Sequence, residues 1–292
     1  MEFSRKTTDT GPSARPKEKE LCSRYRHYRR FPTKALCHLL GFLVLPLLLL
    51  PSCLPIQIEP APGWEEADLG GGKWWENLSQ HLDPIHTPEG RPLSVRIYGK
   101  GPKTVMIIGG IHGSEPGSAM LVEDFERWIQ QEGPPKSFTL LFVNPANPDG
   151  LAKGVRKNAH RVDLNRNFPA SNFKSLPSSG PKPLSEPESR FLANLIKQFH
   201  PNFILSVHQP RRSVNWDGPA RELAQIMAKA NGYRLEASVG YPTPGSLGSW
   251  AGIDLQIPII TLELPRFPDS QEGFFADNKE AILLALHRVA TQ

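Results

Sequence analysis

The sequence predicts an α/β fold with a mixed, mostly parallel central sheet flanked by helices, in a single domain. Two observations support this class. Apolar runs typical of strands buried on both faces occur at residues 138–143, 203–207 and 257–264. Between these runs lie segments with apolar residues at helical spacing, such as residues 118–130. Strands that alternate with amphipathic helices favour a sheet covered by layers of helices.

Local signals predict the remaining elements. Strands at 93–98 and 104–109 flank Gly99-Lys100-Gly101-Pro102, which is typical of a hairpin turn. Ser185 and Glu188 have capping-box spacing at the start of a helix over 186–199. Two further helices are expected, one over 219–231 that ends at Gly232 and one over about 277–290.

Positive charge is concentrated at the start of the chain. Residues 1–34 contain ten Lys or Arg and four Asp or Glu, which leaves 24 basic and 25 acidic residues for the rest. The sequence pI of about 9.1 therefore reflects the N-terminal segment rather than the domain. The near-neutral remainder argues against a nucleic-acid-binding protein, because such proteins carry basic patches on the folded domain.

A largely apolar segment, Ala35 to Leu50, follows the basic stretch. It is too short for a typical membrane span, and a basic region followed by an apolar run is typical of a secretory signal. We expect residues 1–52 to form a signal peptide, 53–73 a flexible tether and 74–292 the folded domain, which the motifs described below identify as catalytic. The segment ends in a sequence like a bacterial lipoprotein cleavage site, which predicts a periplasmic or cell-envelope protein with lipid on Cys53. An uncleaved N-terminal anchor is the alternative.

The chain has three cysteines, Cys22, Cys37 and Cys53. A product cleaved before Cys53 can form no internal disulfide and no thiolate metal site. Any metal in the domain must therefore be held by histidine and carboxylate side chains.

Polar side chains follow the predicted buried strands at the point where each strand ends. His112 and Glu115 come after residues 104–109, His208 follows 203–207, and Glu263 ends the strand within 257–264. Ligands of open α/β sheets bind at the carboxyl ends of the strands, so these four side chains can converge. Two imidazoles and one carboxylate match the ligand set of catalytic zinc sites, which leave one position open.

Five separated motifs together resemble the zinc carboxypeptidase family. They are GGIHGSEP around His112, GVRKN around Arg156, DLNRNFP around Asn165, SVHQP around His208, and LEL around Glu263. The resemblance covers about residue 85 to the C-terminus and is greatest to the murein tripeptide amidase branch. It implies a zinc-dependent metallopeptidase that binds one zinc per chain.

The resemblance also implies a role for each residue in the motifs. His112, Glu115 and His208 would bind zinc, and Asp163 would accept a hydrogen bond from His112 and fix its tautomer. Glu263 would be the general base that takes a proton from the attacking water and then returns it to the leaving amine.

Four further residues would contact the substrate. Arg156 would stabilise the oxyanion, and Asn165 with Arg166 would bind a terminal carboxylate. Tyr241 resembles the mobile tyrosine that closes over substrate in this family.

The resemblance places Leu247 and Gly248 near the pocket for the substrate side chain, and the sequence shows no charge at the base of that pocket. Four other arginines are interpreted as surface charges: Arg161, Arg211, Arg212 and Arg266.

The function implied is hydrolysis of a peptide bond next to a free carboxylate, in a cell-wall peptide cleaved at the γ-D-glutamyl–diaminopimelate bond. An N-acyl amino acid deacylase of the aspartoacylase or succinylglutamate desuccinylase type is the alternative enzyme. A wall-peptide-binding protein without catalysis is a third hypothesis, which the complete set of zinc ligands and the general base disfavour.

Overall fold

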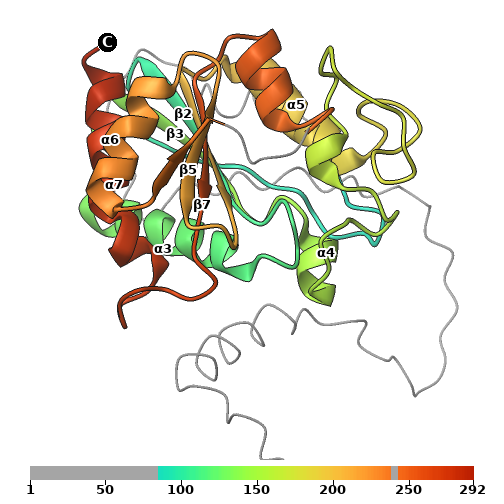
Figure 1. Cartoon of the computed structure of the whole chain (residues 1–292), viewed down its shortest axis with the longest axis horizontal. Coiled ribbons are helices and arrows are strands. Elements are labelled where there is room, and N and C mark those ends of the chain that lie inside the picture. The colour runs from blue at the N-terminus through green and yellow to red at the C-terminus, as the bar shows by residue number, and fades with distance from the viewer. Residues whose placement is uncertain (1–84, 238–242) are drawn as a thin grey trace, which may run out of the picture.

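The computed structural model describes residues 85–237 and 243–292, within which seven strands form one mixed sheet (Figure 1). The strand order is β1-β3-β2-β4-β7-β5-β6. The bounds are β1 (Arg96–Tyr98), β2 (Lys103–Ile108), β3 (Phe138–Val143), β4 (Phe203–His208), β5 (Ser213–Asp217), β6 (Arg234–Glu236) and β7 (Ile259–Glu263). The predicted signal peptide, the tether, the first residues of the predicted domain and Tyr241 lie outside the described residues.

The centre of the sheet is parallel and its flanks contain antiparallel pairs. Strands β3, β2, β4 and β7 pair in parallel, whereas β1 pairs antiparallel with β3 and β5 antiparallel with β7. The central strands are buried along almost their whole length. The predicted α/β class with a mixed, mostly parallel sheet is therefore confirmed.

Helices cover both faces of the sheet. On one face α3 (Pro116–Glu132), α6 (Arg221–Asn231) and α7 (Phe274–Ala290) pack into one apolar cluster (Figure 1). On the other face, α5 (Pro187–Phe199) and the π-helix η2 (Gly248–Asp254) pack into a second cluster. Stacked rings join two helices of the first cluster, with Phe125 of α3 nearly parallel to Phe275 of α7 at 5.2 Å between ring centroids. The fold is therefore held by two apolar layers, one on each side of the sheet.

Helix ends follow the signals in the sequence in most places. Helix α3 begins at Pro116, which suits the first position of a helix because it lacks an N–H. Helix α6 ends where Gly232 adopts the left-handed conformation with φ 67°, as the sequence predicted. The short helices α4 (Pro148–Lys153) and η1 (Leu164–Arg166) were not predicted. None of the helices in the described part of the chain has the length and hydropathy needed to cross a membrane.

Two local predictions are wrong. Strands β1 and β2 do not form a hairpin, because β3 lies between them and pairs with both. The capping box at α5 does not form either. The Ser185 hydroxyl instead donates to Glu186 Oε1 at 2.8 Å and accepts from Asn167 Nδ2 at 2.9 Å.

Candidate active site

The loop after β2 places two of the predicted metal ligands. Gly110 allows the chain to turn with φ 66°, and its N–H donates to the Ser118 hydroxyl at 3.1 Å. The Ser118 hydroxyl in turn donates to the carbonyl of Glu115, the residue at the N-terminal cap of α3. His112 and Glu115 therefore leave the end of β2 on a loop that is tied to the first turn of the helix.

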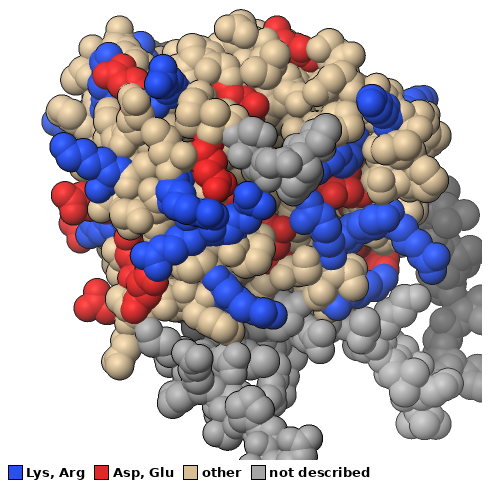
Figure 2. Space-filling model, viewed as in Figure 1, with Lys and Arg blue, Asp and Glu red and all other residues tan. Residues whose placement is uncertain are grey.

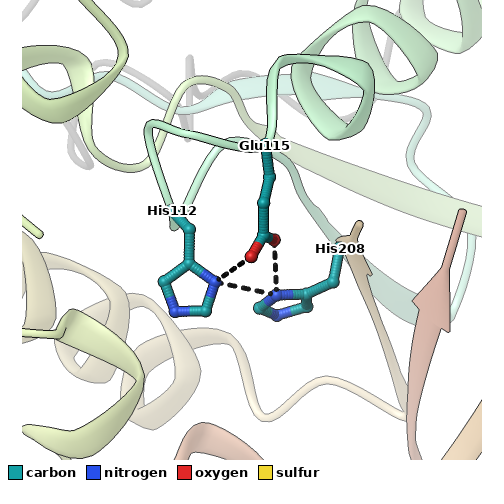
Figure 3. A group of neighbouring side chains, drawn as sticks. All are labelled: His112, Glu115 and His208. Carbon is teal, nitrogen blue, oxygen red and sulfur yellow. Dashed lines mark hydrogen bonds and ion pairs between the residues drawn. The ribbon is translucent and has the colours of Figure 1, made fainter. Parts of the chain in front are cut away.

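His112, Glu115 and His208 converge from two strand ends (Figure 3). Glu115 Oε1 lies 2.9 Å from His112 Nδ1, and Glu115 Oε2 lies 3.1 Å from His208 Nδ1. The two Nδ1 atoms are 3.2 Å apart. All three side chains are buried. Ligand atoms bound to one tetrahedral zinc at about 2.0–2.1 Å lie roughly 3.3 Å from one another, so the cluster fits a zinc ion.

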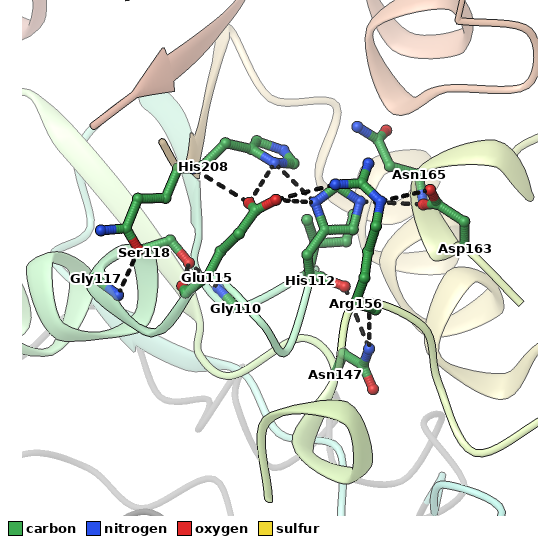
Figure 4. A network of polar contacts seen from close by, with 12 residues as sticks. Gly110, His112, Glu115, Gly117, Ser118, Asn147, Arg156, Asp163, Asn165 and His208 are labelled. Atoms are coloured by element: carbon green, nitrogen blue, oxygen red, sulfur yellow. Dashed lines mark hydrogen bonds and ion pairs between the residues drawn. The ribbon is translucent and has the colours of Figure 1, made fainter. Parts of the chain in front are cut away.

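Asp163 sets the tautomer of His112. Its Oδ1 lies 3.0 Å from His112 Nε2 and its Oδ2 accepts from Arg156 Nε at 2.9 Å (Figure 4). The Asn165 N–H also donates to Asp163, at 3.0 Å. Burial opposes ionisation of Asp163, but contact with His112 outweighs it and lowers the pKa of the carboxyl. An ionised Asp163 keeps the proton of His112 on Nε2, which leaves Nδ1 free to bind metal.

Arg156 lies beside the cluster rather than inside it. Its guanidinium donates to Glu115 Oε1 at 3.1 Å as well as to Asp163, and 40% of the side chain is exposed (Figure 4). A cation held by two carboxylates at the edge of a cavity can face an anion that develops there. The pKa of Glu115 is set by the two histidines. Burial opposes the ionisation of this carboxyl, but contact with His112 and His208 outweighs it and lowers the pKa.

Asn165 and Arg166 lie on η1 and line the same cavity as the cluster. Asn165 Oδ1 accepts from the Leu247 N–H at 2.9 Å. With its oxygen engaged, the side chain of Asn165 has its amide donors left for a ligand. Arg166 donates to the backbone carbonyl of Asn165 at 2.5 Å, and both side chains line the cavity.

Glu263 is the last residue of β7 and is paired in register with His208. Its side chain lines the cavity, and only 8% of the surface of the residue is exposed. Its Oε2 is buried without a hydrogen-bond partner among the described residues. Burial raises the pKa of this carboxyl. A buried carboxylate oxygen with an unused lone pair beside a metal-binding cluster can accept a proton.

The cavity has a volume of about 280 Å³, and two of its residues correct the sequence interpretation. Arg211 lines it, so this residue is not merely a surface charge. Asp217 also lines it and lies against Gly248, where a Cβ atom would come within 2.0 Å of Asp217 Oδ2. The expectation of a pocket without charge near Leu247 and Gly248 is therefore wrong.

The remaining arginines are confirmed as surface charges. Arg161, Arg212 and Arg266 are exposed, and Arg212 pairs with Asp269 at 2.9 Å.

A sequence pattern could have identified the cavity residues Asn215 and Asp217, which the sequence analysis missed. The segment SVNWD, residues 213–217, alternates polar and apolar side chains, which is typical of a strand with one polar face. It forms β5, and its residues Asn215 and Asp217 line the cavity.

The chain belongs to the zinc carboxypeptidase family, because residues 80–283 match the sequence pattern of that family. It is therefore a hydrolase of a zinc-dependent family, and its buried His-Glu-His cluster can hold one metal ion.

Within that family the chain is similar to murein peptide amidase A. It is 37% identical to the protein of this name from Escherichia coli strain K12 over 176 residues, or 55% of this chain and 70% of the relative. It is 33% identical to that from Vibrio campbellii over 177 residues, or 55% of this chain and 68% of the relative. The crystal structure of a murein-tripeptide amidase from Escherichia coli O157 superposes with a TM-score of 0.59 and 31% identity, covering 68% of this chain and 89% of that one.

A more distant structure shows the fold alone. Thrombin activatable fibrinolysis inhibitor superposes with a TM-score of 0.61 at 21% identity, covering 71% of this chain and 67% of that one.

Proposed function

We propose that this hydrolase acts on murein peptides and cleaves the γ-D-glutamyl–diaminopimelate bond, next to a free carboxylate. The observation that carries the proposal is the grouping of Glu263 and three arginines around the His-Glu-His cluster in one cavity. The similarity to murein peptide amidases supports the choice of substrate.

The charge of the cavity suits an anionic substrate. Arg156, Arg166 and Arg211 line it. Figure 2 shows a band of Lys and Arg side chains across the middle of the face drawn in Figure 1, with acidic side chains among them. A murein peptide that ends in glutamate and diaminopimelate carries several carboxylates, and the guanidinium groups of the cavity can bind them.

The side chains at and beside the metal cluster each have a chemical task under this proposal. Zinc held by His112, Glu115 and His208 would act as a Lewis acid, polarising the scissile carbonyl and making a water molecule acidic at neutral pH. Glu263 accepts the proton of the attacking water on its free oxygen and returns it to the nitrogen of the leaving amine. Arg156 donates to the oxygen that becomes negative as the carbonyl is attacked.

Asn165 and Arg166 provide the binding site for the carboxylate of the leaving residue. A planar guanidinium beside an amide N–H₂ gives several parallel donors, which is the geometry that a carboxylate accepts. Fixing that carboxylate holds the scissile carbonyl near Glu263 and the metal cluster.

The test compares three substrates with purified, zinc-loaded protein. Murein tripeptide, a peptide with a C-terminal L-residue and an N-acyl amino acid are incubated separately, and the products are identified by mass spectrometry. We expect release of diaminopimelate from the tripeptide at the highest kcat/KM. Preference for the N-acyl amino acid would instead indicate a deacylase, and binding of the tripeptide without release of product would indicate a receptor.

We further propose that the chain is exported to the periplasm or cell envelope, with residues 1–52 as signal peptide, 53–73 as tether and lipid on Cys53. The basic stretch, the apolar run and the cysteine that follows it support this proposal. An exported enzyme of this class would trim wall peptides or degrade released ones outside the cytoplasm.

A further inference from the structure

The cavity extends from the metal cluster along one face of the sheet. In strands, alternate residues point to the same face, and in-register partners lie side by side. His208 of β4 pairs with Glu263 of β7, which pairs with Ser213 of β5. These residues form a first row at the carboxyl end of β4 and β7.

Two more rows follow on the same face. Two residues back along β7, Thr261 pairs with Ser206 on one side and Asn215 on the other. A further two residues back, Ile259 pairs with Asp217. All five of these side chains line the cavity. Each row is about 6.7 Å from the next, so the third row lies roughly 13 Å along the sheet from Glu263.

The second row offers polar but uncharged groups. Ser206 Oγ is buried without a hydrogen-bond partner among the described residues. Asn215 is fixed, since its amide donates to the Glu236 carbonyl at 2.7 Å. A long substrate side chain can pass this row, but an ammonium group would find no counter-charge there.

The third row contains Asp217, an acidic residue that lines the cavity far from the metal cluster. Among the described lining residues, the acidic ones are Glu115, Glu263 and Asp217, and the first two belong to the metal end. The side chain of Asp217 forms no hydrogen bond or ion pair with another described residue, and burial raises its pKa. A partly buried carboxylate without a partner is costly, and a cation from outside would remove that cost.

The π-helix η2 leaves room for this carboxylate. A Cβ atom at Gly248 would come within 2.0 Å of Asp217 Oδ2, and one at Gly252 within 2.4 Å of Asp217 Cβ. Two glycines four residues apart therefore let the helix lie directly over Asp217 while its carboxylate faces the cavity.

We propose that Asp217 is a specificity-determining residue, which binds an ammonium group at the end of a long side chain on the leaving residue. The inference rests on the proposed function, because it assumes that the leaving residue has its carboxylate at Arg166 and its side chain along the rows. The distal amino group of diaminopimelate has the required charge and lies at the end of such a chain. A leaving residue with a side-chain amine is therefore the preferred class.

The experiment uses matched peptides, L-alanyl-γ-D-glutamyl-lysine and its norleucine analogue, which differ only in the side-chain amine. The zinc-loaded full chain should hydrolyse the lysine peptide with kcat/KM about 10- to 100-fold higher, the usual worth of one charged hydrogen bond. Asp217→Asn, which keeps the shape, should abolish that preference and leave hydrolysis of the norleucine peptide unchanged or faster. Asp254→Asn removes a carboxylate outside the cavity, one that accepts from Ser171, and should keep the wild-type preference.

Three results would overturn the proposal: no preference in the wild type, an amine preference that survives in Asp217→Asn, or an equal loss on both peptides. Calorimetric binding of free lysine and norleucine separates this proposal from the proposed function. Asp217-dependent preference for lysine without hydrolysis of any peptide would refute the enzymatic proposal and retain the ammonium site. Hydrolysis of both peptides at equal rates would retain the enzymatic proposal and refute the ammonium site.

Discussion

At the residue scale, the contacts of Arg156 and Arg166 indicate different roles for the two arginines, one in the chemical step and one in substrate binding. Arg156 is held by Glu115 and Asp163 beside the metal cluster, whereas Arg166 lies against Asn165 on η1. A substrate carboxylate is charged throughout the reaction, but an oxyanion develops only as the carbonyl is attacked. The two arginines should therefore affect different kinetic constants.

We predict that Arg166→Ala raises KM strongly for a free-acid peptide and has little effect on the same peptide amidated at that carboxylate. Arg156→Ala should mainly lower kcat, by about 3 kcal/mol in barrier height if it acts as an oxyanion donor. Steady-state kinetics of both variants on both peptides provide the measurement. An equal loss on both peptides in Arg166→Ala would contradict the carboxylate-binding role.

Glu263 should be required for turnover but not for metal binding. Glu263→Gln preserves the size of the side chain, but an amide cannot accept the proton of the attacking water. We predict that kcat falls by roughly 10²–10⁴-fold, the usual contribution of a positioned acid or base, while zinc content stays unchanged. Metal analysis and kinetics on the same preparation check this, and near-normal turnover would place the base elsewhere.

The metal itself depends on three side chains from two strand ends. We predict about one zinc bound per chain, and loss of tight binding in His112→Ala and in His208→Ala, because two ligands seldom hold zinc. Atomic absorption after dialysis against a weak chelator gives the stoichiometry. Circular dichroism shows whether each variant is still folded. Full zinc content in a folded double variant would exclude the cluster as the site.

The sequence predicted the metal cluster because His112 and Glu115 come in the loop after one buried strand and His208 comes at the end of another, and parallel strands end at one edge of the sheet. Asp163, Arg156, Asn165 and Arg166 came from the resemblance, since no spacing rule brings these loops to the cluster. Asp217 was missed because β5 was not recognised as a strand.

At the element scale, the start of α5 contains a buried acid with an unusual pKa. Glu188 is 0% exposed, and its Oε2 accepts from Asn158 at 3.2 Å. Its Oε1 has no partner in the described part of the chain. Burial raises the pKa of Glu188 from 4.5 to about 7, with a smaller contribution from the neighbouring carboxylates of Glu186 and Asp149.

This shift predicts a loss of stability as the pH rises. The folded state holds the proton of Glu188 more tightly than the unfolded state, so its stabilising effect is complete below pH 4.5 and lost as the pH rises through about 7. The loss amounts to about 3 kcal/mol, since each pKa unit is worth about 1.4 kcal/mol. Glu188→Gln, which cannot ionise, should not lose this stability. Urea unfolding of both proteins between pH 5 and 8 measures the difference, and parallel curves would refute the assignment.

Helices and strands were predicted correctly where the pattern lies within one segment of the sequence, and were missed where the structure depends on distant segments or resembles a loop. Apolar runs and helical spacing identified β3, β4, β7 and α3, since a strand or helix buried against the sheet must be apolar there. The hairpin failed because the partner of β1 is β3, some 40 residues downstream, and a turn sequence does not specify which strand pairs with which. The π-helix η2 was missed because its two glycines resemble a loop.

At the scale of the whole molecule, the chain combines a basic N-terminal stretch with a domain of balanced charge. Residues 1–34 account for ten of the 34 Lys and Arg residues, and the remainder is close to neutral. Charge attraction to an anionic membrane surface would therefore come from the N-terminal segment, which is the part that a signal peptidase would remove. After that cleavage, the domain would have little electrostatic attachment of its own.

Retention at the membrane should then depend on Cys53. We predict that the wild-type protein is recovered in the membrane fraction in a lipid-modified form, because an acyl chain buried in the bilayer contributes about 0.8 kcal/mol per CH₂ group. Cys53→Ser removes the acceptor thiol and should release the protein or leave it unprocessed with a larger mass. Fractionation, detergent partitioning and intact-mass measurement of both proteins provide the test. Wild-type protein recovered in the cytoplasm with residues 1–52 intact would refute export. Export with equal membrane retention in Cys53→Ser would indicate an uncleaved anchor, because the apolar segment 35–50 would then hold the chain without lipid.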